Sequence, residues 1–293
     1  MKTLSIIIVT YCSDDFISDC LSSIYSYNDL GDEEIEVIIV DNSPSASNLM
    51  KQIVGKFPNV RLISNPKNGG FGQGNNVGAV AASGKILLFL NPDTKFIEPV
   101  FCEVIKHFGN GNVRAVGCQL VDGEGHKTNT YGYFPEKWSL LVSIIDKCVF
   151  KPLGYIPKFS IYPWGANFFV RRKDFYAAGK FDEGLFLFHE ESDLCQRLSP
   201  KETHIIKQKI IHYGGHTSIE NSKRFEVWLK SLVFYHEKYG YDLNQTLGRY
   251  KRALFLSLLR RFFLGQGCCD LRNMIGKLTS LQHSLTKQFQ PLP

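Results

Sequence analysis

The side chains in this sequence best suited to bind a metal or transfer a proton are acidic residues that follow apolar segments. Asn91-Pro92-Asp93 comes directly after the apolar run from Ile86 to Leu90. A run so short predicts a buried strand and not a membrane span. Asp93 would then emerge where a parallel strand ends, which is the edge where open α/β sheets bind ligands. A carboxylate there could hold Mg²⁺ or Mn²⁺ against a diphosphate, although Asn-Pro-Asp is also an ordinary turn.

A second acidic cluster precedes an amphipathic segment. Glu190, Glu191 and Asp193 place three acids within four residues. Crowded carboxylates raise one another's pKa, and a raised pKa suits a general base. Acids are also favourable at a helix N-terminus, so capping is the alternative. Further on, His212 and His216 flank a glycine pair and could bind a cation or phosphate, or be purely structural.

Polar residues also follow the first two predicted strands. Thr10 and Tyr11 come after the first, and Asp41 and Asn42 come after the second. The Asp41 carboxylate could accept hydrogen bonds from a base or ribose, and Tyr11 could stack on a ring. Because parallel strands end at one edge, we expect these residues to converge with Asn91-Pro92-Asp93.

The segment from Asn68 to Asn76 is rich in glycine and asparagine, and its candidate ligand-binding residues are Asn68, Gly70, Phe71 and Asn75. Glycines let a backbone approach a phosphate or sugar closely. The segment does not match the G-x-G-x-x-G register, and it lacks the Gly-Lys-Ser/Thr of a P-loop. We expect a ligand-binding loop, with a flexible surface loop as the alternative.

Alternating strand and helix patterns must position these residues. Apolar runs predict strands at 4–9, 36–40, 60–63, 86–90 and 113–119. Between the earlier strands, apolar residues recur at the spacing of a helix, which predicts a helix in each connection. This rhythm predicts an α/β fold with a mostly parallel sheet and helices on both faces. We expect a long loop at 123–163 with a short helix at 140–145, then regular structure at 165–171. A helical C-terminal region follows, at 225–239 and 245–263.

Composition limits the class of protein. The 293 residues are 44% hydrophobic and 21% charged, which is ordinary for a globular protein with one large core. The apolar stretch at the start is too short for an export signal, and no apolar run reaches 18 residues, so we expect a cytoplasmic protein. None of the eight cysteines forms a C-x-x-C pair, and we expect them to be reduced.

The net charge of +6 is concentrated at the end of the chain. Residues 223–293 carry 12 Lys and Arg against 4 Asp and Glu, whereas residues 1–222 carry 22 against 24. Basic and apolar side chains alternate between Arg249 and Phe263, which predicts a cationic amphipathic helix. Such a helix could lie on an anionic inner leaflet or pack on the rest of the protein. The predicted sheet carries no combination of basic and aromatic side chains of the kind that binds nucleic acid, so we do not expect nucleic acid as a partner.

The motifs together resemble a known family. In chain order they are Val9-Thr10-Tyr11, Asp41-Asn42-Ser43, Asn68-Gly69-Gly70-Phe71, Gly74-Asn75-Asn76, Asn91-Pro92-Asp93, Trp164-Gly165-Ala166, Phe181-Asp182-Glu183, and Glu190-Glu191-x-Asp193 with Arg197. Their combined order over residues 4–240 is similar to family 2 glycosyltransferases of the GT-A fold, particularly the bacterial rhamnosyltransferases of O-antigen and cell-wall assembly.

The resemblance implies an inverting transfer of a sugar from a nucleoside-diphosphate donor. Thr10, Tyr11 and Asp41 would hold the nucleoside, and Asn75 with its surrounding segment would lie against the donor. Asp93 would hold Mg²⁺ or Mn²⁺ with the diphosphate. Because Asn91 stands where many relatives have an acid, His212 could supply a further metal ligand.

On the acceptor side, the resemblance implies that Trp164, Gly165 and Ala166 line the site. The base that takes the acceptor proton would lie in the acidic pair, where Glu-Glu replaces the family's usual Glu-Asp. We favour Glu191 over Glu190.

The resemblance further implies a lipid-linked (polyprenyl diphosphate) glycan acceptor and a peripheral enzyme on the inner face of the plasma membrane. Rhamnose from dTDP-rhamnose is the donor it suggests. We expect a catalytic domain at 1–222, with a nucleotide-sugar half at 1–120 and an acceptor half at 121–222, and a basic helical region at 223–293. The alternatives are an inactive sugar-nucleotide-binding module and a nucleotidyltransferase, although 10–15 contains no Lys or Arg to bind phosphate.

Overall fold

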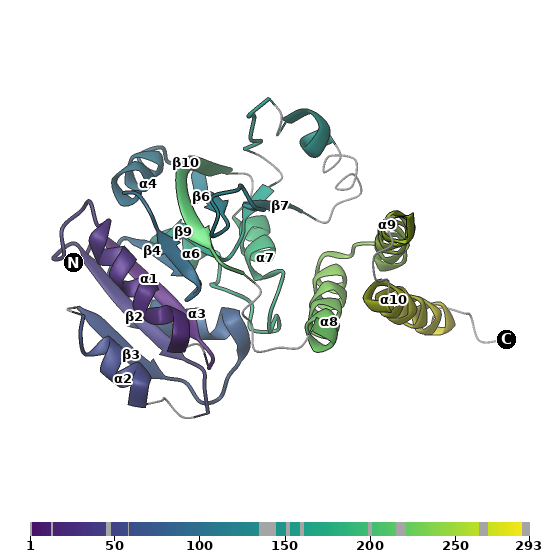
Figure 1. Cartoon of the computed structure of the whole chain (residues 1–293), viewed down its shortest axis with the longest axis horizontal. Helices are drawn as coiled ribbons and strands as arrows, with labels where there is room; N and C mark the ends of the chain where they lie inside the picture. Colours follow the sequence, from purple (N-terminus) through teal and green to yellow (C-terminus); the bar gives the residue numbers. More distant parts are fainter. Residues whose placement is uncertain are drawn as a thin grey trace.

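The chain folds around one eight-stranded sheet, with three helices projecting beyond it (Figure 1). The structure is a computed structural model that describes residues 2–12, 14–44, 48–57, 59–134, 145–150, 153–158, 161–198, 201–214, 221–263 and 269–288. The strands are β1 (Leu4–Thr10), β2 (Ile35–Asp41), β3 (Val60–Ser64), β4 (Ile86–Leu90), β5 (Thr94–Phe96), β6 (Val113–Val121), β7 (Tyr131–Tyr133), β8 (Ile161–Pro163), β9 (Asn167–Arg171) and β10 (Glu202–His212). The helices are α1 (Asp14–Ser26), α2 (Asn48–Val54), α3 (Gly70–Ala81), α4 (Phe101–Phe108), α6 (Arg172–Ala177), α7 (Glu190–Arg197), α8 (Asn221–Tyr239), α9 (Leu243–Phe263) and α10 (Cys269–Gln288), with one π-helical turn, η1 (Asp146–Phe150).

The strand order is β3-β2-β1-β4-β9-β6-β10-β5. β3, β2, β1 and β4 pair in parallel, and so do β6 and β10. β9 enters antiparallel between β4 and β6, and β5 pairs antiparallel with β10. The predicted α/β class with a mostly parallel sheet is therefore confirmed. The reversed strand β9 was not predicted, because local pattern does not reveal strand direction.

Helices cover both faces of the sheet, as predicted. In β1, the side chains of Ile6 and Ile8 join a core with α1, α2 and α4, whereas Ile7 joins a second core with α3, α6 and α7. This division follows from the two-residue period of a strand. Burial on both faces explains why β1, β2 and β4 read as continuous apolar runs.

The glycine-rich segment is a helix from Gly70 onward, so the predicted loop at 68–76 is wrong. A Cβ at Gly78 would lie 2.4 Å from Cγ2 of Ile7, and one at Gly74 would lie 2.9 Å from Cγ1 of Val9. Glycine costs about 1 kcal/mol in a helix relative to alanine. Here the absence of side chains at Gly74 and Gly78 lets α3 pack closely against β1. We therefore assign these glycines a packing role.

The stretch at 123–163 is not simply a loop. β7 and β8 pair antiparallel within it, with Tyr131 opposite Pro163. The short helix predicted at 140–145 falls almost entirely outside the described residues, and so does His216. The sequence reading also missed α4, α6 and α10, which are either short or follow no clear apolar repeat.

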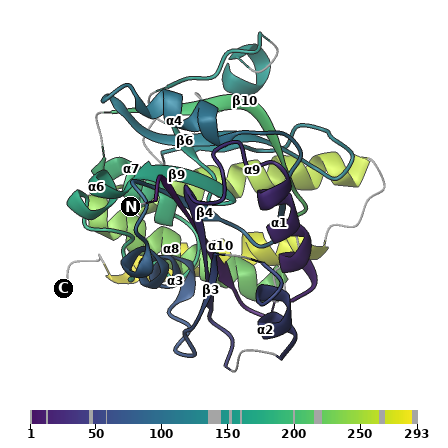
Figure 2. The same ribbon diagram turned by 90° about the vertical axis from the view of Figure 1, so that its left-hand side faces the viewer.

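The C-terminal helices form a separate small core, which confirms the predicted helical region. Leu232 of α8, Leu247 of α9 and Leu278 of α10 are buried together. The three helices lie on the side of the sheet away from the amino terminus (Figure 1; Figure 2 shows the amino-terminal side). Within the described part of the chain, no helix has the length and apolar content needed to cross a bilayer.

We expect Gly78→Ala to destabilise the protein by about 1–3 kcal/mol, because the added methyl group would push α3 away from Ile7. Denaturant unfolding measures the effect.

The matched control is Gly276→Ala in α10, where no atom lies within 4 Å of the added Cβ. That variant should be stabilised by about 0.5–1 kcal/mol, through helix propensity alone. Equal effects at the two positions would contradict the packing role of Gly78.

Candidate active site

Buried polar groups organise the carboxyl ends of β1 and β2. The Thr10 hydroxyl donates to Oδ1 of Asp41 over 3.2 Å, and the Ser43 N–H donates to the same oxygen over 3.0 Å. Thr10 and Asp41 are both buried, whereas Tyr11 beside them is 40% exposed. The sequence-predicted residues therefore do meet at this edge, and Tyr11 is the most exposed of the three.

Asn42 is occupied by the protein itself. Its Nδ2 donates to Oδ1 of Asn68 (3.3 Å) and to the Gly70 carbonyl (3.1 Å), and its Oδ1 accepts from Asn65 (2.7 Å). These bonds fasten the end of β2 to the start of α3. Asn42 and Asn68 therefore hold this edge in shape, and the direct ligand contact that the sequence suggested for them stays a prediction.

Gly70 and Phe71 contact another loop. The Phe71 N–H donates to the Phe186 carbonyl over 2.9 Å, and a Cβ at Gly70, where φ is +91°, would lie 2.0 Å from the same oxygen. Asn75 is fully buried: its Nδ2 donates to the Phe71 carbonyl, while its Oδ1 has no hydrogen-bond partner among the described residues. This region therefore links α3 to the loop before the acidic cluster.

Asp93 and His212 come together although 118 positions separate them. β5 and β10 pair so that Thr94 lies opposite His212. The Nε2 of His212 is then 3.4 Å from Oδ1 of Asp93 and 3.4 Å from Nδ2 of Asn91. A carboxylate oxygen and an imidazole nitrogen thus lie close together at this edge of the sheet.

A turn before β9 joins this position to the acidic cluster. Leu90 pairs with Asn167, and the Asn91 N–H donates to the Ala166 carbonyl over 3.1 Å. One residue earlier, a Cβ at Gly165 would lie 1.8 Å from Oε1 of Glu191, so any side chain at position 165 would displace the Glu191 carboxylate. Asn91 and Glu191 therefore flank a single turn.

The turn residues differ in their exposure. Trp164 remains 38% exposed, but Ala166 is buried in the core. The predicted acceptor-lining role is therefore feasible for Trp164 and for the Gly165 backbone. Ala166 contributes its carbonyl to Asn91 instead of a side chain to a ligand.

Glu190 and Glu191 have different surroundings. Glu190 is buried, its Oε1 has no hydrogen-bond partner among the described residues, and burial followed by the charge of Glu191 raises its pKa far above the ordinary value. Glu191 is half-buried, and burial raises its pKa to about 7 although its own N–H and the Gly165 N–H favour the charged form. A carboxylate with this pKa can accept a proton near neutral pH.

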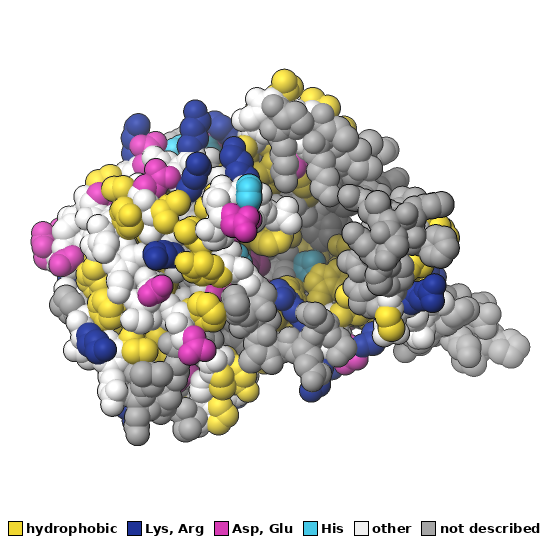
Figure 3. All heavy atoms as spheres, viewed as in Figure 1, with side chains coloured by type: hydrophobic (Ala, Val, Ile, Leu, Met, Phe, Trp, Pro, Cys, Tyr) yellow, Lys and Arg dark blue, Asp and Glu magenta, His cyan; other side chains and the backbone are white. Residues whose placement is uncertain are grey.

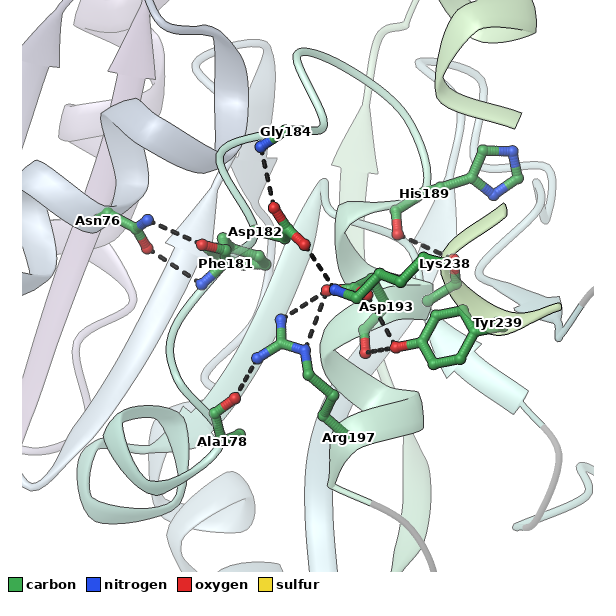
Figure 4. Close-up of polar contacts among 11 residues, drawn as sticks. Asn76, Ala178, Phe181, Asp182, Gly184, His189, Asp193, Arg197, Lys238 and Tyr239 are labelled. Atoms are coloured by element: carbon green, nitrogen blue, oxygen red, sulfur yellow. Dashed lines mark hydrogen bonds and ion pairs between the residues drawn. The ribbon is translucent and has the colours of Figure 1, made fainter. Parts of the chain in front are cut away.

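Asp193 is fully engaged by protein groups (Figure 4). Its Oδ2 accepts from Arg197 Nη2 (2.6 Å) and Nε (3.0 Å), and its Oδ1 accepts from Lys238 Nζ (2.6 Å) and the Tyr239 hydroxyl (2.8 Å). The side chain is completely buried. Each carboxylate oxygen therefore binds two protein groups, which favours a positioning role, and the catalytic role suggested from the sequence stays a prediction.

The same contacts attach α8 to the acidic cluster. Lys238 also pairs with Asp182 at 2.6 Å, and the Ser231 hydroxyl donates to the Leu187 carbonyl over 2.7 Å. Asn76 holds the other side of this loop, donating to the Phe181 carbonyl and accepting from the Phe181 N–H (Figure 4). The sequence did not reveal Lys238 or Tyr239, and Asn76 stood out only as part of the Gly74-Asn75-Asn76 motif. Only Arg197, four residues after Asp193, was detectable as a helical ion pair.

His189 precedes the acidic pair in a left-handed conformation, with φ of +70°. Burial lowers the pKa of its imidazole to about 4, so the ring is neutral. The centroid of the ring lies 5.3 Å from that of the Tyr235 ring of α8.

The surface is hollowed between the sheet body and the C-terminal helices. Hydrophobic and histidine side chains are visible inside this hollow (Figure 3).

The donor set at Asp93 fits a hard divalent cation. Among the described residues, no three His, Cys, Asp or Glu side chains form a metal-binding group. Asp93 and His212 would therefore supply two ligands and leave the remaining positions to water and ligand oxygens. Mg²⁺ is commonly held in this way, by one or two protein groups plus substrate phosphates.

Sequence comparison identifies relatives. The family description Glycosyl transferase family 2 matches residues 5–175. Rhamnosyltransferase WbbL of Escherichia coli (strain K12) is 31% identical over 255 residues, which cover 78% of this chain and 91% of WbbL.

Structure comparison shows the same fold in two solved proteins. S. aureus TarS 1–349 in complex with UDP has a TM-score of 0.55 and 17% identity, covering 100% of this chain and 93% of that one. In a longer TarS structure, the match covers 79% of this chain but only 43% of that one. Mannosyltransferase PcManGT from Pyrobaculum calidifontis, in complex with GDP-Man and Mn²⁺, has a TM-score of 0.57 and 14% identity, covering 80% of this chain and 64% of that one.

We expect Lys238→Met to destabilise the protein by about 1–3 kcal/mol, because the buried Asp193 carboxylate would lose one charged partner. Denaturant unfolding of the single variants and of the double variant with Asp193→Asn gives the coupling energy.

Lys277→Met is the matched control. Lys277 pairs with Glu226 at the same 2.6 Å distance, but the Glu226 side chain is 56% exposed. Its loss should change stability little. A Lys238 effect no larger than the Lys277 effect would contradict the anchoring role of Asp193.

Proposed function

The chain belongs to family 2 of the glycosyltransferases, and from that membership we propose that it transfers a sugar, with inversion, from a nucleoside-diphosphate donor to a lipid-linked glycan. Rhamnose from dTDP-rhamnose is the proposed donor, because the 31% identical relative WbbL is a rhamnosyltransferase. The proposed acceptor is a polyprenyl diphosphate-linked glycan of bacterial surface polysaccharide such as O-antigen.

The observation that carries the proposal is the shared turn between Asp93 and Glu191. The Asn91 N–H binds the Ala166 carbonyl, and Gly165 contacts Glu191. An inverting displacement needs a base on one side of the sugar and a stabilised diphosphate on the other. Two acidic positions on either side of one turn support this arrangement.

In the proposed reaction, Glu191 takes the proton of the acceptor hydroxyl as that oxygen attacks the anomeric carbon. Its pKa of about 7 leaves a substantial ionised fraction at neutral pH and keeps the group basic enough to accept a proton. Glu190 stays protonated beneath it, because burial raises its pKa and an ionised Glu191 raises it further. The pair therefore provides a single base.

Asp93 and His212 would hold the divalent cation against the donor diphosphate. When bound, the cation neutralises the negative charge of the departing diphosphate. His212 must be neutral to serve as a ligand, and its Nε2 already faces Asp93 at 3.4 Å. The Mn²⁺ in the PcManGT structure supports this assignment by fold likeness only.

The nucleoside and sugar would contact the remaining edge residues. Tyr11, Trp164, Phe186 and Tyr213 retain 40%, 38%, 40% and 40% exposure. Aromatic faces of this kind stack on bases and on the apolar faces of sugars. We propose that Tyr11 contacts the donor base, with Thr10 and Asp41 supporting it from beneath, and that Trp164 contacts the acceptor.

We also propose that the chain divides near residue 222 and that the C-terminal helices bind the cytoplasmic face of the plasma membrane. On α9, Leu247 is buried, while Phe255 and Leu259 are 52% and 39% exposed. Exposed apolar residues next to the basic residues Lys251 and Arg252 suit an anionic lipid surface. Packing and membrane contact therefore use different faces of one helix.

A mass-spectrometric screen of nucleoside-diphosphate sugars with a glycolipid acceptor tests the proposal. Donor-dependent transfer supports it. Nucleotide binding without transfer for any donor would favour an inactive binding module, and transfer of a nucleotidyl group would favour a nucleotidyltransferase.

We expect Glu191→Gln to abolish transfer while sparing nucleotide binding, and Asp93→Ala to remove the Mn²⁺-dependent part of nucleotide binding. Each variant loses a different half of the site, because one residue faces the acceptor proton and the other faces the diphosphate. Single-turnover assays and calorimetric titration of the nucleoside diphosphate, with and without Mn²⁺, separate the two losses.

The pH dependence gives an independent check on Glu191. The parent's transfer rate should rise with pH through about 7, as the base ionises. The raised folded-state pKa also means that the stability contributed by protonated Glu191 is fully present below about 4.5 and is lost as pH rises through about 7. Glu191→Gln should therefore be about 1–3 kcal/mol more stable than the parent at pH 8 and equal to it near pH 4. Normal transfer in this variant would remove Glu191 from the base role.

We expect Phe255→Ser with Leu259→Ser to weaken binding to anionic vesicles by at least about tenfold, because each buried apolar side chain contributes about 1.5–3 kcal/mol. Vesicle co-sedimentation measures the effect. Since both side chains are exposed, the fold should survive.

The control is Val80→Ser, which removes another exposed apolar side chain from α3 of the sheet body. It should leave vesicle binding unchanged. Equal binding by the parent and the α9 variant would show that α9 only packs within the C-terminal core.

A further inference from the structure

A cavity of about 630 Å³ lies at the other end of the strands that carry the candidate site. It is bounded by residues 84–86 before and at the start of β4, by the end of α4, and by residues 171–176 after β9. β4 leads from this cavity toward Asn91 at about 3.3 Å per residue, so the cavity is roughly 20 Å from the candidate active site. Figure 2 shows β4, β9 and α6 on the side of the molecule that carries the amino terminus.

The floor of the cavity is apolar. Ile86, Ile105, Phe108 and the Tyr176 ring line it. Ile86 and Phe108 are almost fully buried, whereas Tyr176 is 38% exposed at the opening. The volume is in the range of small-molecule sites, which combine a mainly apolar lining with a few polar groups.

The rim of the cavity is basic. Lys85, Arg171, Arg172 and Lys173 contribute to the lining, and no acidic residue does. Arg171 is already satisfied, since it donates to the Val113, Phe108 and Asn110 carbonyls and pairs with Asp174. In the part of the chain that the structure describes, Lys85, Arg172 and Lys173 form no ion pair.

Arg172 carries the most specific signal. Its Nε is buried and has no hydrogen-bond partner among the described residues. Its guanidinium carbon is 5.3 Å from the centroid of the Tyr176 ring, which holds the group at the cavity. A buried donor without a partner costs about 1–3 kcal/mol. The terminal nitrogens of the same guanidinium form no hydrogen bond with the described residues and are not buried, so they are the donors that a ligand in the cavity would meet.

We propose that this cavity binds an amphiphilic anion, in which a phosphate, sulfate or carboxylate group is attached to an apolar or aromatic body. The anionic group meets Arg172, Lys85 and Lys173, and the apolar body lies against Ile86, Ile105 and Phe108. Arginine is well suited to such oxyanions, because its planar guanidinium donates charge-assisted hydrogen bonds. The site is separate from the sugar-transfer site and does not depend on the proposed function.

Calorimetric titration with 2-naphthyl phosphate, 2-naphthol and inorganic phosphate tests both halves of the proposal on the full chain. The combined probe should bind at least about tenfold more tightly than either half. Arg172→Met and Lys173→Met keep an unbranched side chain but remove the charge. Each should weaken the combined probe by about tenfold and leave 2-naphthol unchanged.

Lys106→Met is the matched control, because Lys106 is an exposed cation on α4 that pairs with Glu103 and does not line the cavity. It should not change any of the three affinities. Lys173 is exposed, so its variant remains informative if Arg172→Met fails to fold.

Equal binding of 2-naphthol and 2-naphthyl phosphate would overturn the anion site, and so would undiminished binding by Lys173→Met together with a folded Arg172→Met. Competition by phosphatidylglycerol vesicles, but not by phosphatidylcholine vesicles, would identify a lipid headgroup as the source of the anion. Unchanged probe binding with both vesicles would identify a soluble metabolite.

Discussion

The antiparallel pairing of β9 with β4 is the constraint on which the candidate site depends. It places Asn167 opposite Leu90, so the turn before β9 meets the turn after β4. Through this pairing, Gly165 reaches Glu191 and Ala166 reaches Asn91. A parallel β9 would begin at the other edge of the sheet and carry Trp164 away from Asp93. The direction of one strand therefore determines whether Asp93 and Glu191 lie near the same turn.

A buried carboxylate connects this site to the C-terminal helices. Asp193 would be costly to bury alone, and Arg197, Lys238 and Tyr239 together satisfy it. Two of these three partners come from α8, so α8 helps to hold the acidic cluster in position. Residues beyond 222 are consequently part of the site's support, even though α8, α9 and α10 have a core of their own.

Adjacent acids acquire different properties from their surroundings alone. Glu190 faces α3 near Gly72 and is buried, whereas Glu191 faces the Gly165 turn. Desolvation raises the pKa of both, and the nearby charge of Glu191 raises that of Glu190 further. The first acid therefore remains protonated, and the second can exchange a proton near neutral pH. The Glu191 carboxylate lies in the space that a side chain at position 165 would fill.

The sequence by itself determined the strands β1 to β4 and β6, the class of the fold, the family and the positions of the acids, since apolar runs and motifs can be recognised without the tertiary structure. It also indicated that His212 could join Asp93. It could not determine that Asn42 and Asp193 bind other groups of the protein, that the glycine-rich segment from Gly70 onward is a helix against β1, or that Lys238 and Tyr239 anchor the acidic cluster. Those outcomes depend on which groups meet after folding. Strand direction, burial and hydrogen-bond partners between distant residues arise only from tertiary packing.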